Sequence, residues 1–60
     1  MASYWEIWCD GSLRMGLFIP RRIMWVLLKH LSEIGNYYAI RTDTRTGRSL
    51  EVCVDATLRV

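Results

Sequence analysis

The sequence has few of the residues from which catalytic and metal sites are built. It contains two cysteines, Cys9 and Cys53, and one histidine, His30, with no Cys-x-x-Cys pair. A structural zinc site takes four such ligands, so no metal is expected. His30 lacks a serine, cysteine or carboxylate at helical spacing on its core side, and Glu33 at i+3 is an ordinary surface neighbour. We therefore expect a protein that is not an enzyme and needs no cofactor.

Long apolar runs are also absent, and we expect no targeting segment. The longest apolar run in the helical segment, Ile23 to Leu28, is far shorter than the roughly 20 residues that cross a bilayer. The first six residues have neither the charged region nor the apolar region of a signal peptide. We expect two reduced thiols in a cytoplasmic protein without a membrane partner, and a disulfide only if the strands of Cys9 and Cys53 are neighbours.

Strong charge of either sign is missing. The net charge is +2, with eight Lys and Arg against six Asp and Glu. A dedicated nucleic-acid binder has a denser basic stripe. All but one of the cations are arginine, which suits planar and bidentate contacts better than diffuse attraction.

The length of 60 residues restricts the chain to one small domain, 1–60. A body of this size buries a small share of its surface and lies near the lower limit of independent folding. Such chains often gain stability from a disulfide, a metal or a partner chain. A homodimer is therefore one expected outcome.

An amphipathic segment, Pro20 to Asn36, is the clearest pattern that is present. Its apolar residues recur at helical spacing within an arc of about 140°, which is the stripe that a helix buries. Pro20 suits the first helical position, and Gly35 suits a left-handed stop, so we predict a helix over about 20–34. The stripe consists of Ile23, Met24, Leu27, Leu28, Leu31 and Ile34.

A hairpin is predicted before the helix, because aromatic and branched residues flank Asp10-Gly11. A two-residue turn would pair Ile7 with Arg14 and mix the faces. A three-residue loop, with Gly11 in the left-handed region, pairs Ile7 with Leu13 and is our prediction. The predicted buried face is Trp5, Ile7, Leu13, Met15 and Leu17, and the outer face is Tyr4, Glu6, Trp8, Ser12 and Arg14.

A second hairpin is predicted after the helix, from Tyr37 to Asp43 and from Arg48 to Asp55. A loop over 45–47 sets Arg41 opposite Glu51, and this pair of opposite charges supports the register. Residues 56–60 either extend the last strand or form a frayed tail. The predicted buried face is Tyr38, Ile40, Thr42, Leu50, Val52 and Val54, and the outer face is Tyr37, Ala39, Arg41, Glu51, Cys53 and Asp55.

The order hairpin, helix, hairpin predicts an α+β fold, ββαββ. We expect a four-stranded, mainly antiparallel sheet with the helix packed on one face. Gly16 lies in the middle of the second predicted strand, where glycine weakens a strand. This leaves βαββ with three strands as the alternative.

Core packing does not explain four residues of the helix. Arg21 and Arg22 occupy the first turn, where the helix dipole favours anions, so they are either solvated or form a site for a phosphate or carboxylate. Trp25 lies outside the apolar stripe, between Arg21 and Lys29. It either anchors a partner or stacks a base, or it covers the sheet edge under an arginine stem.

Two further groups are candidate sites. Aromatic residues on the predicted outer sheet face indicate an interface, unless they only stabilise a thin sheet by cross-strand pairing. Three arginines surround the second turn, where they either grip phosphates or belong to an ordinary polar loop. The first group includes Tyr4, Trp8, Arg14 and Tyr37, and the second is Arg41, Arg45 and Arg48.

We expect a non-enzymatic binding protein that acts by protein–protein interaction on another protein or complex, such as a phage or mobile-element inhibitor of a host complex. The alternative is a small nucleic-acid-binding protein that uses the Arg and Trp face of the helix together with Arg41, Arg45 and Arg48. The expected partner-binding residues are Arg21, Arg22, Trp25, Lys29, Tyr4, Trp8, Arg14 and Tyr37.

Overall fold

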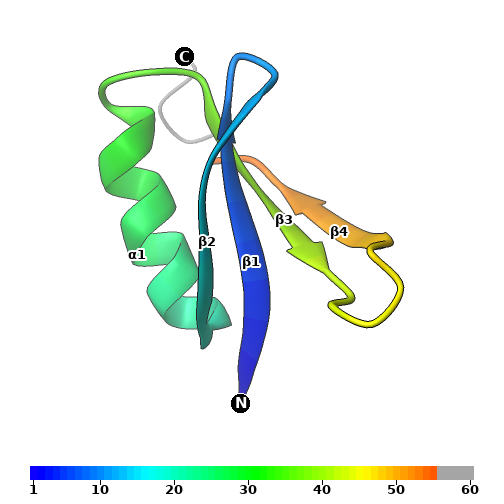
Figure 1. Ribbon diagram of the computed structural model, residues 1–60. Coiled ribbons are helices and arrows are strands. Elements are labelled where there is room, and N and C mark those ends of the chain that lie inside the picture. Colours follow the sequence, from blue (N-terminus) through cyan, green and yellow to red (C-terminus); the bar gives the residue numbers. More distant parts are fainter. Residues whose placement is uncertain (56–60) are drawn as a thin grey trace.

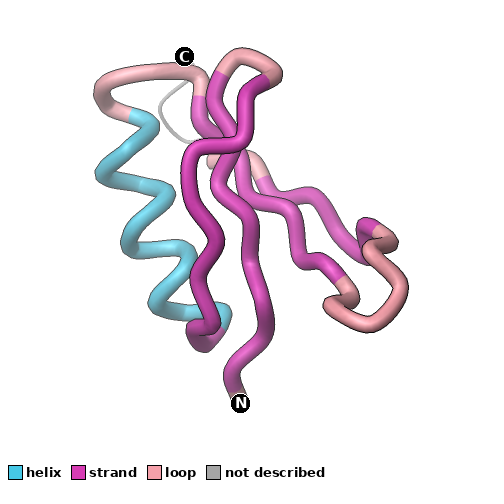
Figure 2. The backbone as a smooth tube through the Cα atoms, in the orientation of Figure 1, coloured by secondary structure: helices cyan, strands magenta, loops and turns pink. Residues whose placement is uncertain are grey.

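The fold consists of two hairpins and one helix, and the computed structural model describes residues 1–55. The strands form one antiparallel sheet in the order β2-β1-β3-β4, with the helix against one face (Figure 1, Figure 2). The predicted ββαββ fold is confirmed, and the three-stranded alternative is wrong. The elements are β1 (Ala2–Cys9), β2 (Ser12–Pro20), α1 (Arg21–Ser32), β3 (Tyr37–Thr42) and β4 (Ser49–Cys53). The predicted tail or strand extension over 56–60 lies outside the described residues.

The first hairpin turns through two residues, so the predicted three-residue loop is wrong. Asp10 and Gly11 have φ of 51° and 80°, the left-handed pair of a type I′ turn. The predicted left-handed Gly11 is confirmed. The pairing of β1 with β2 shifts by one residue between Ile7 and Trp8. Because of this bulge, Ile7 pairs with Met15, and not with Arg14, which a two-residue turn in a regular ladder would place opposite it. As a result Leu13 pairs with Trp8 and leaves the predicted buried face.

Strand β2 runs unbroken through its central glycine. Gly16 lies opposite Glu6, and the ring of Tyr4 covers it so closely that a Cβ at this position would lie 2.8 Å from Tyr4 Cζ. An aromatic ring that fills the space above a glycine compensates for the missing side chain. The strand therefore tolerates the residue that had suggested a break.

The second hairpin has the predicted register as far as Arg41, which lies opposite Glu51, with Ile40 opposite Val52. Beyond Arg41 the register shifts, so Thr42 pairs with Ser49 and Leu50 becomes the extra residue. The predicted loop over 45–47 is therefore wrong, because the connection runs from the end of β3 at Thr42 to the start of β4 at Ser49. The cross-strand ion pair that supported this register is also present, with 3.1 Å between Arg41 Nε and Glu51 Oε1.

The faces of this second hairpin are reversed relative to the prediction. Ala39 is fully buried and Cys53 nearly so, whereas Val52 is 60% exposed. The cause is the pairing of β3 with the central strand, which sets Ala39 opposite the buried Ile7. Small residues at these positions let the helix approach the sheet closely. The more apolar set, including Ile40, therefore faces away from α1.

The helix buries a narrower stripe than its sequence indicates. Met24 and Leu28 are fully buried against β1 and β3, and Leu27 and Leu31 pack beside them. Ile23 and Ile34, at the margin of the predicted stripe, are exposed. The core consists of Trp5, Ile7, Met24, Leu28, Ala39 and Cys53.

Both helix ends differ from the prediction. Pro20 closes β2 in an extended conformation and precedes the first helical residue, so it is not the first residue of the helix. At the other end the cap is Glu33, and Gly35 does not adopt a positive φ. A Cβ on Gly35 would lie 3.1 Å from the ring of Tyr37. A side chain at this position would crowd Tyr37, so the close approach of that ring favours glycine here, and a left-handed stop does not.

The two thiols lie on strands that are not neighbours. Cys9 is on β1 and Cys53 on β4, with β3 between them. Two strand spacings amount to roughly 9.6 Å, which exceeds the reach of about 7 Å between the Cα atoms of a disulfide. Both cysteines are free and buried.

Candidate protein interface

One face of the sheet is covered by α1, and the opposite face carries large apolar side chains. Because Trp5 and Ile7 point toward the helix, the alternate residues of β1 point away from it. Their partners in the neighbouring strands extend this face across the sheet. We call it the open sheet face, and it consists of Tyr4, Glu6, Trp8, Leu13, Gly16, Phe18, Tyr38, Ile40 and Val52.

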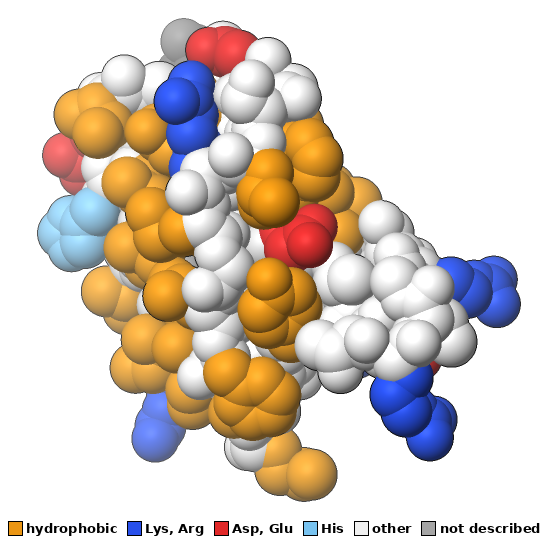
Figure 3. Space-filling model, viewed as in Figure 1, with side chains coloured by type: hydrophobic (Ala, Val, Ile, Leu, Met, Phe, Trp, Pro, Cys, Tyr) orange, Lys and Arg blue, Asp and Glu red, His pale blue; other side chains and the backbone are white. Residues whose placement is uncertain are grey.

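Several apolar side chains of this face are largely exposed. Phe18 is 71% exposed, Val52 60% and Leu13 51%. With the half-buried residues between them, they form a continuous apolar surface on the folded domain. Figure 3 shows hydrophobic side chains crowded over α1, β1 and β2 in one view.

The aromatic residues of the open sheet face support one another. The rings of Trp8 and Tyr38 stack with their centroids 6.4 Å apart and their planes 13° apart. These two residues lie opposite each other on β1 and β3. Together with Tyr4, which rests on Gly16, they offer broad rigid surfaces that lose little conformational entropy on binding.

Glu6 is the one charged residue among those that the register places on this face. Its carboxylate Oε1 accepts a hydrogen bond of 3.1 Å from Trp8 Nε1. Glu6 lies on the inner strand β1, opposite Gly16 on one side and Ile40 on the other. No ion pair among residues 1–55 reaches it.

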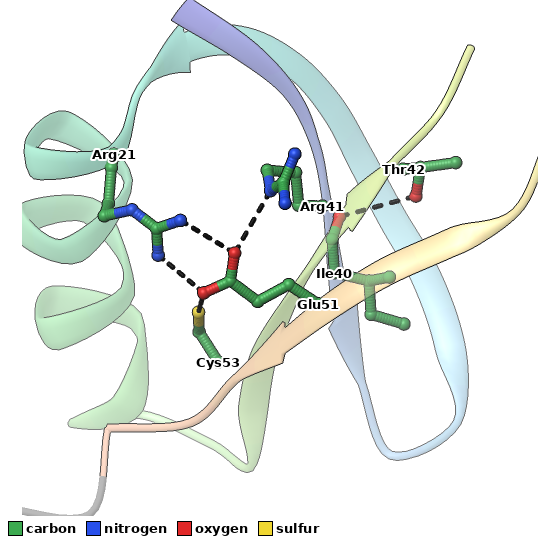
Figure 4. Close-up of polar contacts among 6 residues, drawn as sticks. All are labelled: Arg21, Ile40, Arg41, Thr42, Glu51 and Cys53. Atoms are coloured by element: carbon green, nitrogen blue, oxygen red, sulfur yellow. Dashed lines mark hydrogen bonds and ion pairs between the residues drawn. The ribbon is translucent and has the colours of Figure 1, made fainter. Parts of the chain in front are cut away.

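The predicted cationic site at the helix start is largely neutralised. Arg21 forms two hydrogen bonds with Glu51, of 2.6 and 2.7 Å, and Arg41 binds the same carboxylate (Figure 4). These arginines lower the pKa of Glu51 to about 2, and Glu51 raises the pKa of Arg21. The Arg21 guanidinium also lies 5.4 Å above the ring of the core residue Trp5. Arg21 and Arg41 therefore tie elements of the fold together.

The other predicted residues of the helix remain at the surface. Arg22 and Lys29 are exposed, and Trp25 is 37% exposed. Arg21 lies one helical turn before Trp25 in the sequence, but its guanidinium is bound to Glu51. An open hollow of about 530 Å³ lies at the start of α1, lined by Met1, Pro20, Arg21 and Arg22.

The remaining residues of the predicted sites lie in different parts of the structure and do not form one site. Tyr37 was predicted on the outer face, and this is wrong: it packs against the core on the helix side. Arg14 is exposed at the bulge of β2, outside the paired register. Arg45 and Arg48 are exposed in the β3–β4 loop, where Lys and Arg side chains project from the surface (Figure 3).

Sequence reasoning missed more than half of the open sheet face. The sequence predicts Tyr38, Ile40 and Val52 in the core because they are the more apolar set of their hairpin. The only local signal in favour of the reverse assignment is the small size of Ala39 and Cys53. Tyr4 and Trp8 were placed correctly because the alternation of β1 alone determines their face.

The described part of the chain was also compared with the requirements of a metal site and of a membrane-spanning helix. Residues 1–55 bring no three His, Cys, Asp or Glu side chains together as metal ligands. None of their helices has the length and apolar character needed to cross a membrane. Comparison with protein-family models, curated proteins and solved structures finds no significant match.

Proposed function

We propose that this chain is a non-enzymatic binding protein that acts by protein–protein interaction through its open sheet face. The observation that carries the proposal is the exposure of Phe18, Leu13 and Val52 beside the stacked pair of Trp8 and Tyr38. Large contiguous apolar surface on a folded domain is typical of an interface. Rigid aromatic residues are the side chains that most often dominate binding energy.

The open sheet face presents several rigid aromatic and aliphatic side chains together. A few such residues supply most of the binding energy of a typical interface. A protein this small acts by occupying a surface, and a phage or mobile-element inhibitor of a host complex is the most concrete form of this proposal.

The charges favour a protein partner over nucleic acid. Among the described residues that form the open sheet face, the charged one is the acidic Glu6, which repels phosphate. Arg21 and Arg41 are paired with Glu51, which reduces the positive charge that they offer to a phosphate backbone. Tight nucleic-acid binding depends on many such contacts.

The proposal is tested by affinity capture from the cells that encode the protein, with variants that leave the fold intact. Phe18→Ser and Val52→Ser remove exposed apolar side chains from the open sheet face. Ile34→Ser is the matched control, because Ile34 is 76% exposed but lies outside the sheet. We expect one protein to be captured by the wild type and by Ile34→Ser, and to be lost with both face variants.

Two results would overturn this proposal. One is capture of the same protein by all four chains, which would place binding elsewhere. The other is captured material that is removed by nuclease or by moderate salt, which would indicate nucleic acid.

A further inference from the structure

The open sheet face places a carboxylate where a partner must cover it. Glu6 lies between Tyr4 and Trp8 along β1, and between Gly16 and Ile40 across the sheet. Any protein that covers these apolar neighbours also strips water from the carboxylate. Burying an unpaired charge costs several kcal/mol, so a stable complex has to supply a counter-charge.

The carboxylate of Glu6 is held in place and only partly satisfied. Trp8 Nε1 donates to Oε1 at 3.1 Å, and no hydrogen bond within residues 1–55 reaches Oε2. An ionised carboxylate accepts about four hydrogen bonds. Its free acceptor sites can therefore receive a donor from above the sheet.

The surroundings of Glu6 suit a guanidinium in particular. Arginine presents several donors in one plane, and that plane also stacks on aromatic faces. Trp8 donates to Glu6 and stacks on Tyr38, so a cation on Glu6 meets an aromatic surface at the same place. An ammonium group satisfies the charge but not the stacking.

We infer that the partner of the open sheet face is a different protein that presents an arginine or a lysine from an apolar surface, with the cation bound to Glu6. This inference rests on the proposed function and specifies the chemistry of the partner. The apolar residues around the cation cover Phe18 and Val52, and the cation neutralises the one charge that the register places on the face.

A second copy of this chain fits the face less well. A symmetric dimer that covers the whole face places its twofold axis near the middle, where Glu6 lies, and so brings two carboxylates together. Among the residues paired into this face none is cationic. Arg14 stands at the bulge, outside the paired register.

The test uses a random peptide display library selected on the immobilised protein, followed by affinity measurements for the enriched peptides. We expect these peptides to share an arginine or lysine beside aromatic or aliphatic residues. Their affinity should fall at least about tenfold for Glu6→Gln, because a desolvated charge pair is lost. Glu6→Gln keeps the acceptor for Trp8, so the face keeps its shape. The charges can also be exchanged: a peptide in which glutamate replaces the cation should bind the Glu6→Arg variant.

Control variants separate the inference from the proposed function. Loss of binding with Phe18→Ser but not with Glu6→Gln would keep the face as an interface and overturn the cationic partner. Equal binding to wild type, Phe18→Ser and Glu6→Gln would overturn both. Sedimentation equilibrium addresses the second copy: self-association that becomes stronger in Glu6→Gln would identify the chain itself as the occupant and overturn the inference.

Discussion

Arg21 and Glu51 join the first turn of α1 to the edge strand β4 through two hydrogen bonds of 2.6 and 2.7 Å. Arg41 on β3 binds the same carboxylate. One acidic side chain thus connects the helix with the last two strands of the sheet. Arg21 also covers the ring of Trp5 on β1, so these contacts reach three of the four strands.

We expect stability to depend on the ionisation of Glu51. The pKa of its carboxyl is about 2 in the folded chain, against an ordinary value of 4.5, so the folded state favours the charged form. The contribution is complete above the ordinary pKa and disappears as the pH falls toward 2. Denaturation midpoints measured from pH 6 to pH 2 should fall more steeply for the wild type than for Glu51→Gln.

Glu6→Gln is the matched control for this pH experiment, because no ion pair of the described residues involves Glu6. It should retain the steep acid dependence of the wild type. If Glu51→Gln loses stability in parallel with the wild type across this range, the carboxylate of Glu51 does not hold the helix to the sheet.

We expect the apolar stripe of α1 to divide into essential and dispensable residues. Met24→Ala and Leu28→Ala remove fully buried side chains and should each lower the free energy of unfolding by about 2–5 kcal/mol. Ile23→Ala removes an exposed side chain and should cost less than about 1 kcal/mol. Urea titration followed by far-UV circular dichroism measures all three, and equal losses would contradict the narrow buried stripe of α1.

The reversed faces of the second hairpin lead to another expectation. Ala39 is fully buried and Val52 largely exposed. Ala39→Leu should destabilise the fold by about 1–3 kcal/mol through overpacking, while Val52→Thr should change stability by less than about 1 kcal/mol. The opposite ranking in chemical denaturation would restore the assignment that the sequence suggested.

The thiols should be slow to react in the folded protein. Cys53 is buried, and burial together with the nearby carboxylate of Glu51 raises its pKa, so little thiolate is present at neutral pH. Alkylation with iodoacetamide should proceed slowly at Cys53 in buffer and quickly in denaturant. After mild oxidation the intact mass should show no internal disulfide, since Cys9 and Cys53 are two strands apart. A loss of two hydrogens from the monomer would contradict this arrangement.

Local patterns are sufficient for the element order and for the register of β3 and β4 as far as Arg41. Alternation and turn residues indicate two hairpins around a helix, and the opposite charges of Arg41 and Glu51 support their pairing. The predicted length of the first turn is wrong because it assumes a regular ladder of paired residues. In the structure, a bulge after Ile7 accommodates one additional residue. A bulge leaves no clear signal in a single sequence.

The remaining differences come from contacts between distant parts of the chain. The face of β3 depends on its pairing with β1, which sets Ala39 opposite Ile7, and nothing within the second hairpin specifies that choice. The partner of Arg21 lies 30 residues away. The composition of the open sheet face therefore depends on the strand order. The pattern of each hairpin alone predicts only those residues of the face that β1 contributes.

The strand order also has a consequence for folding kinetics. β1 precedes the other described strands in the sequence, yet it occupies the interior of the sheet and needs both β2 and β3 beside it. Its pairing with β2 closes a short hairpin, but its pairing with β3 has to wait until Tyr37 and the residues after it are available. Closing that long loop costs more entropy, so the seam between β1 and β3 is expected to limit the folding rate. A nascent chain held before Tyr37 would leave one side of β1 without its neighbouring strand.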